Sequence, residues 1–263
     1  MVIDKLMREF DASITTVQGY LDVIQNIKEH NESKDNKADL VFRGQNVDEP
    51  LRPKLSRLFE DGNLNGNFIK VEELMLADFE RGVLPLTEFR PENNWDLLAL
   101  AQHHGLPTRL LDWSYSALVA LYFAVEKAAV NDDQGRARNG VVWILSTTKD
   151  DFRKLDSNEE PFDVTSTKIF RSSVISRRIS AQSGLFTVHR IGEEGKVYKF
   201  ETIENFKDRL TKISIPHDCF AWLRKQLHIL GVNYSTIYPD INGLARHLEW
   251  RYSKYSDEKN IKK

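Results

Sequence analysis

The sequence predicts an α+β fold, and three observations lead to this prediction. Apolar residues recur every three or four positions through much of the first half of the chain, which is typical of amphipathic helices. Short apolar and β-branched runs cluster in the second half. Helices and strands do not alternate regularly, as they would in a parallel βαβ architecture. No repeat or linker interrupts the 263 residues, so we expect a single domain.

The N-terminal region is expected to be a helix followed by a loop. Residues 2–27 carry a stripe of apolar side chains at helical spacing: Ile3, Leu6, Phe10, Ile14, Val17, Leu21 and Ile24. Residues 28–39 are polar and have no potential to enter a core. This region, 1–37, precedes a core over 38–250, and residues 251–263 are expected to form a flexible tail.

The core is expected to contain six further helices and six extended segments. The helical patterns cover residues 54–59, 68–85, 94–105, 116–130, 218–232 and 242–256. The extended segments are 40–45, 106–113, 140–147, 183–191, 196–203 and 210–216. Residues 60–68, 132–140 and 151–173 are expected to be loops or irregular structure.

Charge and composition narrow the possible environments. A formal net charge of -2 gives the whole chain no attraction to nucleic acid or to a membrane. The longest apolar stretch, around Ala117 to Val125, is too short to cross a bilayer. One cysteine, Cys219, excludes an internal disulfide, and the N-terminus lacks a secretory signal. We therefore expect a cytoplasmic protein that does not contact membranes.

The stretch LVFRGQ contains the first candidate binding residue, Arg43. Its planar guanidinium suits two-point contact with a phosphate or carboxylate, and Gly44 lets a ligand approach the backbone closely. The alternative is a structural arginine that donates to carbonyls of a neighbouring loop.

The stretch TRLLDWSYSALVALYFA contains the expected start of a helix. Ser114 or Ser116 can cap the helix that follows, and a helix N-terminus favours phosphate or carboxylate. Asp112 can pair with Arg109 or Arg43. The alternative is a well-capped core helix with an internal Asp–Arg pair.

The same stretch holds two aromatic residues, Trp113 and Tyr115, whose flat rings suit a heteroaromatic ligand. A third stretch, RRISAQSGLFTVHR, places Gln182 at the entry of a strand, where it can face a site or satisfy a turn.

Metal chemistry is not expected. His103 and His104 are adjacent, so on a helix they point about 100° apart and do not have the i, i+4 spacing that chelates one metal. We expect both to be exposed or satisfied in the core. The sequence also lacks the glycine-rich, metalloprotease and nucleophile-elbow motifs of several common enzyme classes.

Four stretches together resemble the FRG-domain family, named for a Phe-Arg-Gly motif. They are FRGQ (42–45), LALAQHHGLPTRLLDWSYSALVALYFAVEKA (98–128), RRISAQSGLFTVH (177–189) and LGVNYSTIYPDINGLARHL (230–248). The resemblance spans residues 38–250. FRG domains distantly resemble ADP-ribosyltransferases, which implies a split β-sheet core with N-terminal and flanking helices.

The resemblance also implies a catalytic set and a co-substrate, NAD. The set is an arginine on the first strand, a serine at a strand–helix junction and a polar residue at a later strand, which correspond here to Arg43, Ser114 (or Ser116) and Gln182. NAD is expected to contact Phe42, Arg43, Gly44, Gln45, Arg109, Asp112, Trp113, Ser114, Tyr115 and Tyr122. Among these, Trp113, Tyr115 or Tyr122 would stack on nicotinamide.

The chain departs from the transferase pattern at its third position. Gln182 stands where a glutamate is usual, and an amide can bind a ribose hydroxyl but offers no full negative charge. Either Asp112, Asp240 or Glu249 supplies the acid, or turnover is weak or absent.

The resemblance further implies a toxin of bacterial defence, including antiphage defence, that a protein antitoxin holds in check. A basic band of Arg171, Arg177, Arg178, Arg190, Lys196 and Lys199 favours RNA as the acceptor, with protein second. The alternative is a surface band that Glu193 and Glu194 balance. Two other functions stay open: a non-catalytic module that senses NAD or a related nucleotide, and an interaction scaffold.

Overall fold

The six-stranded sheet at the centre of the molecule confirms the α+β class. The computed structural model describes residues 14–32, 39–64, 66–87, 90–154, 157–173, 181–192 and 198–259. The strands are β1 (Leu40–Gln45), β2 (Leu110–Ser114), β3 (Gly140–Ser146), β4 (Lys168–Phe170), β5 (Gly184–Val188) and β6 (Leu210–Ile215). Their order is β4-β5-β2-β1-β3-β6, and every neighbouring pair is antiparallel.

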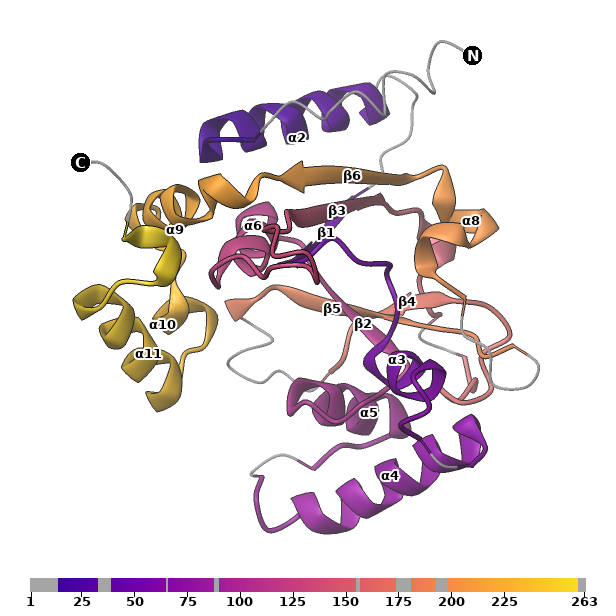
Figure 1. Ribbon diagram of the computed structural model, residues 1–263. Helices are drawn as coiled ribbons and strands as arrows, with labels where there is room; N and C mark the ends of the chain where they lie inside the picture. The colour runs from indigo at the N-terminus through magenta and orange to yellow at the C-terminus, as the bar shows by residue number, and fades with distance from the viewer. Residues whose placement is uncertain are drawn as a thin grey trace.

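Helices surround this sheet in three groups. Their bounds are α2 (Val17–Glu32), α3 (Lys54–Glu60), α4 (Phe68–Val83), α5 (Asn94–His103), α6 (Ala117–Val125), α8 (Glu204–Lys207), α9 (Phe220–Ile229), α10 (Tyr234–Ile237) and α11 (Ile241–Tyr252). In Figure 1, α2 lies beside β6, α9 to α11 gather at one side, and α3 to α5 lie beyond β2.

The sheet is nearly parted between β1 and β2. These two strands share a single register pair, Phe42 with Ser114. By contrast, β1 pairs with β3 from Leu40 to Gln45, along its whole length. The sheet therefore consists of two halves, β4-β5-β2 and β1-β3-β6, which meet at one point.

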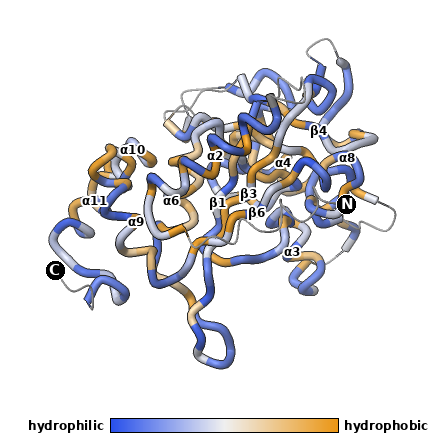
Figure 2. Tube along the Cα trace, turned by 90° about the horizontal axis from the view of Figure 1, so that it is seen from above, coloured by the Kyte–Doolittle hydropathy of each residue, from blue (hydrophilic) through white to orange (hydrophobic). Residues whose placement is uncertain are grey.

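Each half has an apolar core of its own, and a third core joins the two halves through residues such as Val41 and Leu111. On the β1-β3-β6 half, α2, α6 and α9 bury residues such as Tyr20, Leu121 and Leu223. On the other half, α4 and α5 bury Leu76 and Leu98 against β2, β4 and β5. Apolar residues run along β3 and β6 through the middle of the molecule in Figure 2. Burial of these apolar side chains stabilises the fold through the hydrophobic effect.

Gly44 allows α6 to pack directly on β1. A Cβ atom at this position would lie 1.8 Å from the carbonyl oxygen of Ala120 and 2.9 Å from the backbone nitrogen of Ala124. Neither backbone atom can move without displacing the helix. The glycine of the FRGQ stretch is thus required by helix packing.

We expect Gly44→Ala to lower the free energy of unfolding by about 1–3 kcal/mol, the usual cost of overpacking a core. Gly82→Ala is the matched control, because Gly82 lies inside α4 with open space around its Cβ direction. That control should be neutral or slightly stabilising, since alanine favours helices. Urea unfolding of both variants decides the point, and equal midpoints would contradict it.

The structure corrects two boundaries near the N-terminus. Residues 14–16 precede α2, which begins at Val17, and residues 28–32 continue it instead of forming a loop. Residues 1–13 of the predicted first helix lie outside the described residues. Two side-chain contacts hold the extra turn: Gln25 Nε2 donates to Glu29 Oε1 (2.7 Å), and Asn31 Nδ2 donates to Ser146 Oγ (2.8 Å).

The predicted strand over residues 196–203 is also wrong. Phe200–Thr202 form a 3₁₀ turn, and residues 196–197 lie outside the described residues. Phe200 is fully buried, and its N–H donates to the Leu51 carbonyl (2.9 Å). Tertiary burial has overridden the alternating pattern here. Conversely, β4 lies within the stretch 151–173 that was expected to be irregular.

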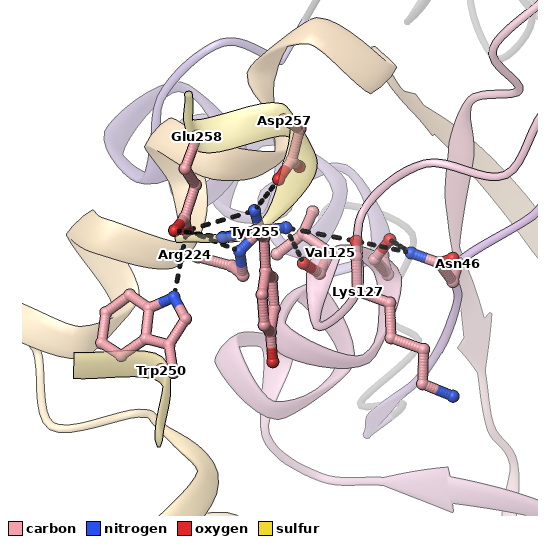
Figure 3. A network of polar contacts seen from close by, with 9 residues as sticks. Asn46, Val125, Lys127, Arg224, Trp250, Tyr255, Asp257 and Glu258 are labelled. Carbon is pink, nitrogen blue, oxygen red and sulfur yellow. Dashed lines mark hydrogen bonds and ion pairs between the residues drawn. The ribbon is translucent and has the colours of Figure 1, made fainter. Parts of the chain in front are cut away.

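The predicted flexible tail is wrong for residues 251–259. Residues 251–252 still belong to α11, and Ser256–Glu258 form a 3₁₀ turn. Figure 3 shows Asp257 and Glu258 meeting the buried guanidinium of Arg224 on α9. The same guanidinium donates to the carbonyls of Val125 (2.8 Å) and Lys127 (3.1 Å) at the end of α6. The C-terminal turn therefore belongs to the fold.

Candidate functional site

A pocket of about 290 Å³ lies where the two half-sheets part. β1 contributes Phe42, Arg43 and Gly44, and β2 contributes Asp112, Trp113 and Ser114. The remaining lining residues that the structure describes are Gln102, His103, Ala120, Phe123, Gln182 and Tyr238. All three residues expected to form the catalytic set, Arg43, Ser114 and Gln182, therefore face one cavity.

Arg43 bridges the gap between the half-sheets. Its Nη1 donates to the Asp112 carbonyl (2.8 Å) and lies 3.6 Å from Asp112 Oδ2. Its Nε is buried and has no hydrogen-bond partner within the described residues. Burial lowers the pKa of this guanidinium, the Asp112 charge opposes that shift, and Arg57 reinforces it. An arginine remains charged under such a shift, so the pocket holds a partly unsatisfied cation.

Ser114 ties the end of β2 to the start of β5. Its Oγ accepts the Ser116 N–H (2.9 Å) and donates to the Gln182 carbonyl (2.6 Å). Ser116, not Ser114, caps α6, since its side chain accepts from the Val119 N–H. The serine at the junction thus fixes the backbone beside the pocket.

Gln182 connects the pocket wall to α10. Its Nε2 donates to the Ile237 carbonyl (3.3 Å). The next residue, Ser183, has a φ of 48°, in the left-handed region, and its carbonyl accepts the Tyr115 N–H (3.1 Å). The chain therefore turns sharply at this point before it enters β5.

Asp112 is the one carboxylate among the described lining residues. Gln102 Nε2 donates to its Oδ2 (2.9 Å), and its side chain is 56% exposed. The two other candidate acids do not line the pocket. Asp240 caps α11 by accepting the Gly243 N–H (2.8 Å), and Glu249 lies exposed on that helix.

Arg109, expected to contact NAD, is held elsewhere. Its guanidinium forms a buried ion pair with the carboxylate of Glu72, with 2.6 Å between Arg109 Nη2 and Glu72 Oε2. Both side chains are almost fully inaccessible. Arg109 therefore joins α4 to β2 and does not line the pocket.

The aromatic residues expected to stack on nicotinamide separate in the structure. Trp113 lines the pocket, but Tyr115 packs its ring against Arg171. Tyr122 is buried in the core on α6, and this burial raises the pKa of its phenol. Gln45 lies beyond the pocket, where its Oε1 accepts from Trp143 Nε1 (3.0 Å).

A buried polar chain extends behind Trp113. Its indole Nε1 donates to Thr187 Oγ1 (3.1 Å), which lies 3.2 Å from His189 Nε2. Burial, reinforced by the charges of Arg43 and Arg109, lowers the pKa of His189 to about 3. The imidazole is therefore neutral at physiological pH, and it adds no positive charge beside Arg43.

Sequence reasoning missed five residues that line the pocket: Gln102, His103, Ala120, Phe123 and Tyr238. All five lie in stretches already singled out, QHHG, ALYFAV and STIYPD. The signal was present, but the direction of each side chain depends on how α5, α6 and α10 dock.

The expected basic band does not gather at the pocket within the described residues. Arg171 stacks on Tyr115 and Phe152, and Arg190 is exposed beyond β5. Arg177, Arg178 and Lys196 lie outside the described residues.

The described residues contain neither a candidate metal site nor a candidate membrane-spanning helix. They contain no cluster of three or more His, Cys, Asp or Glu side chains that could hold a metal ion. None of their helices combines the length and apolarity that crossing a bilayer needs.

Comparison with known proteins adds one finding. A family model described as the FRG domain matches residues 38–133. This range includes Arg43, His103, Asp112 and Ser114, and it ends before Gln182. Neither the curated proteins nor the solved structures gave a match.

Proposed function

We propose that this chain, whose residues 38–133 match the FRG domain model, binds NAD in its pocket and transfers ADP-ribose to an acceptor. The observation that carries the proposal is that three residues far apart in the sequence line the same cavity. Arg43, Ser114 and Gln182 come from positions 71 and 68 residues apart in the chain, yet they line one cavity at neighbouring strands. The near-parting of the sheet also fits the split core of an ADP-ribosyltransferase-like fold.

The pocket has features that suit NAD as a substrate. The buried Arg43 Nε has a hydrogen to donate, and a guanidinium suits phosphate oxygens or ribose hydroxyls. A volume of about 290 Å³ is at the low end for ligand pockets, so it suits one half of a dinucleotide. Trp113 lines the wall, although its indole ring is packed in the core near Phe200 and bonds Thr187.

Asp112 is the acid that we propose in place of the usual glutamate. Breaking the nicotinamide–ribose bond develops positive charge on the ribose, as in glycoside hydrolysis. A fixed carboxylate near that charge lowers the barrier. Gln102 orients Asp112 within the pocket, while the Gln182 amide supplies a neutral contact.

RNA is the acceptor that we propose first, on the basic band of the sequence, and protein second. We further propose that the chain acts as a toxin in bacterial defence and that an antitoxin protein restrains it. The assay below is designed to separate the two acceptor classes.

Incubation of the protein with NAD labelled in its adenylate phosphate, bacterial RNA and lysate protein tests the transfer directly. We expect label to appear on RNA. We expect Arg43→Ala to abolish this labelling, because the pocket then lacks the cation that binds NAD. Arg136→Ala is the matched control, since Arg136 is exposed and far from the lining residues.

The outcome on each fraction has a distinct meaning. Label on protein alone would keep the transferase and replace the acceptor. No label and no released nicotinamide from the wild-type chain would refute the transferase.

A second candidate, a non-catalytic module that senses NAD, is favoured by one observation. The Ser114 hydroxyl donates to the Gln182 carbonyl, and the Gln182 amide donates to the Ile237 carbonyl. Both groups therefore hold backbone in place. A rise in melting temperature with NAD, without nicotinamide release, would select this function.

A further inference from the structure

His103 is the imidazole at the wall of the pocket. It is the last residue of α5, half-buried, and shares the cavity with Arg43, Asp112 and Ser114. His104 follows as the C-cap residue, is exposed, and does not line the cavity. The two rings meet edge to face at 5.0 Å, and the chain then turns at Gly105 with a φ of 86°. Of two adjacent histidines, one therefore faces the pocket.

The position of His103 is fixed by its neighbours on α5. Leu97, Leu98 and Ala101 are buried in the core of the β4-β5-β2 half. Gln102 links the last turn to β2, since it donates to Asp112 Oδ2 (2.9 Å) and accepts from Thr108 Oγ1 (2.6 Å). The last turn of α5 is thus held against the strand that carries the proposed acid.

Transfer to a hydroxyl or amine acceptor releases a proton, which a group in the pocket must accept. Arg43 is a cation and cannot accept it. Asp112 lies beside Arg43 and is the group proposed above to stabilise the positive charge on the ribose. The Ser114 hydroxyl is a donor to Gln182. Histidine is the residue type that takes up and releases protons near neutral pH.

We propose that His103 is the general base of the reaction, an inference that rests on the proposed function. A ring nitrogen of His103 takes the acceptor's proton while the acceptor oxygen or nitrogen bonds to the anomeric carbon of the ribose. The bond from that carbon to nicotinamide breaks, and its electron pair leaves with neutral nicotinamide. The proton then passes from His103 to solvent. Among the described lining residues, Arg43 and Asp112 are the charged groups that face this exchange.

Paired glutamine variants test the inference. His103→Gln should lower the rate of ADP-ribosyl transfer by about 10²–10⁴-fold, the usual contribution of general-base catalysis. NAD should still raise its melting temperature as in the wild type. His104→Gln is the matched control and should keep full activity. Imidazole added to His103→Ala should restore part of the rate, which a purely structural role would not allow.

Chemical modification supplies a readout that does not depend on turnover. Diethyl pyrocarbonate followed by mass spectrometry should modify both histidines, and NAD should protect His103 but not His104. Equal protection of both rings, or none of His103, would overturn the inference.

The two proposals fail differently. If the wild-type chain transfers ADP-ribose and His103→Gln does so at the same rate, only the assignment of the base is wrong. If the wild-type chain releases no nicotinamide, the transferase is wrong, and the base with it.

Discussion

Glu72→Gln should lower the free energy of unfolding by about 3–5 kcal/mol, because it leaves the Arg109 guanidinium buried without its counter-charge. The exposed fractions of the two side chains are 1% for Arg109 and 2% for Glu72. Glu72 accepts from the Arg109 Nε (2.7 Å) and from its backbone N–H (3.0 Å). Urea unfolding followed by circular dichroism measures the loss.

Two further variants make this expectation specific. Glu73→Gln removes a neighbouring but exposed carboxylate of α4 and should change stability little. The double variant Glu72→Leu with Arg109→Met should recover much of the loss, since replacing a whole buried pair by apolar residues is often neutral. A Glu72→Gln chain as stable as Glu73→Gln would show that the pair contributes no net stability.

Removal of residues 253–263 is the second large effect that we expect, again about 3–5 kcal/mol. The deletion takes away both carboxylates that meet Arg224, whose side chain is only 4% exposed. It also removes the Tyr255 ring, 5.1 Å from that guanidinium, and the acceptor of the Trp250 indole N–H. Differential scanning calorimetry of the truncated chain measures the effect.

A shorter deletion is the matched control. Removal of residues 260–263 leaves Asp257 and Glu258 in place, so its melting temperature should match that of the full chain. If the two truncated chains have the same melting temperature, the network in Figure 3 does not stabilise the fold.

Most elements of the fold could be predicted because their signals are local. The buried strand β3 is a continuous apolar run, and α4 has a strong helical periodicity with Asn67 as its N-cap. The errors arose where distant residues decide. The pattern of residues 196–203 is that of a strand, yet Phe200 turns inward to bond Leu51. The C-terminal segment looks polar and mobile, but its acids neutralise an arginine more than 30 residues earlier.

The candidate site was predictable in part for the same reason. FRGQ and LDWS mark strand ends, and their meeting with Gln182 follows from the sheet. The partner of Arg109 could not be foreseen, because Glu72 lies 37 residues away on another helix. The role of His103 could not be predicted either. The spacing of the two histidines tests only for a metal site, and the direction of the His103 side chain depends on how α5 docks on the sheet.

The narrow junction between β1 and β2 affects how residues far from the pocket can change its affinity for a ligand. The two walls of the pocket belong to different half-sheets, which share one backbone register pair and one common core cluster. The width of the pocket is therefore set mainly by side-chain packing between the halves, not by a continuous backbone ladder. Substitutions deep in either core, at Leu98 or at Leu223, then act on ligand affinity at a distance, and evolution can tune the pocket without altering any residue that lines it.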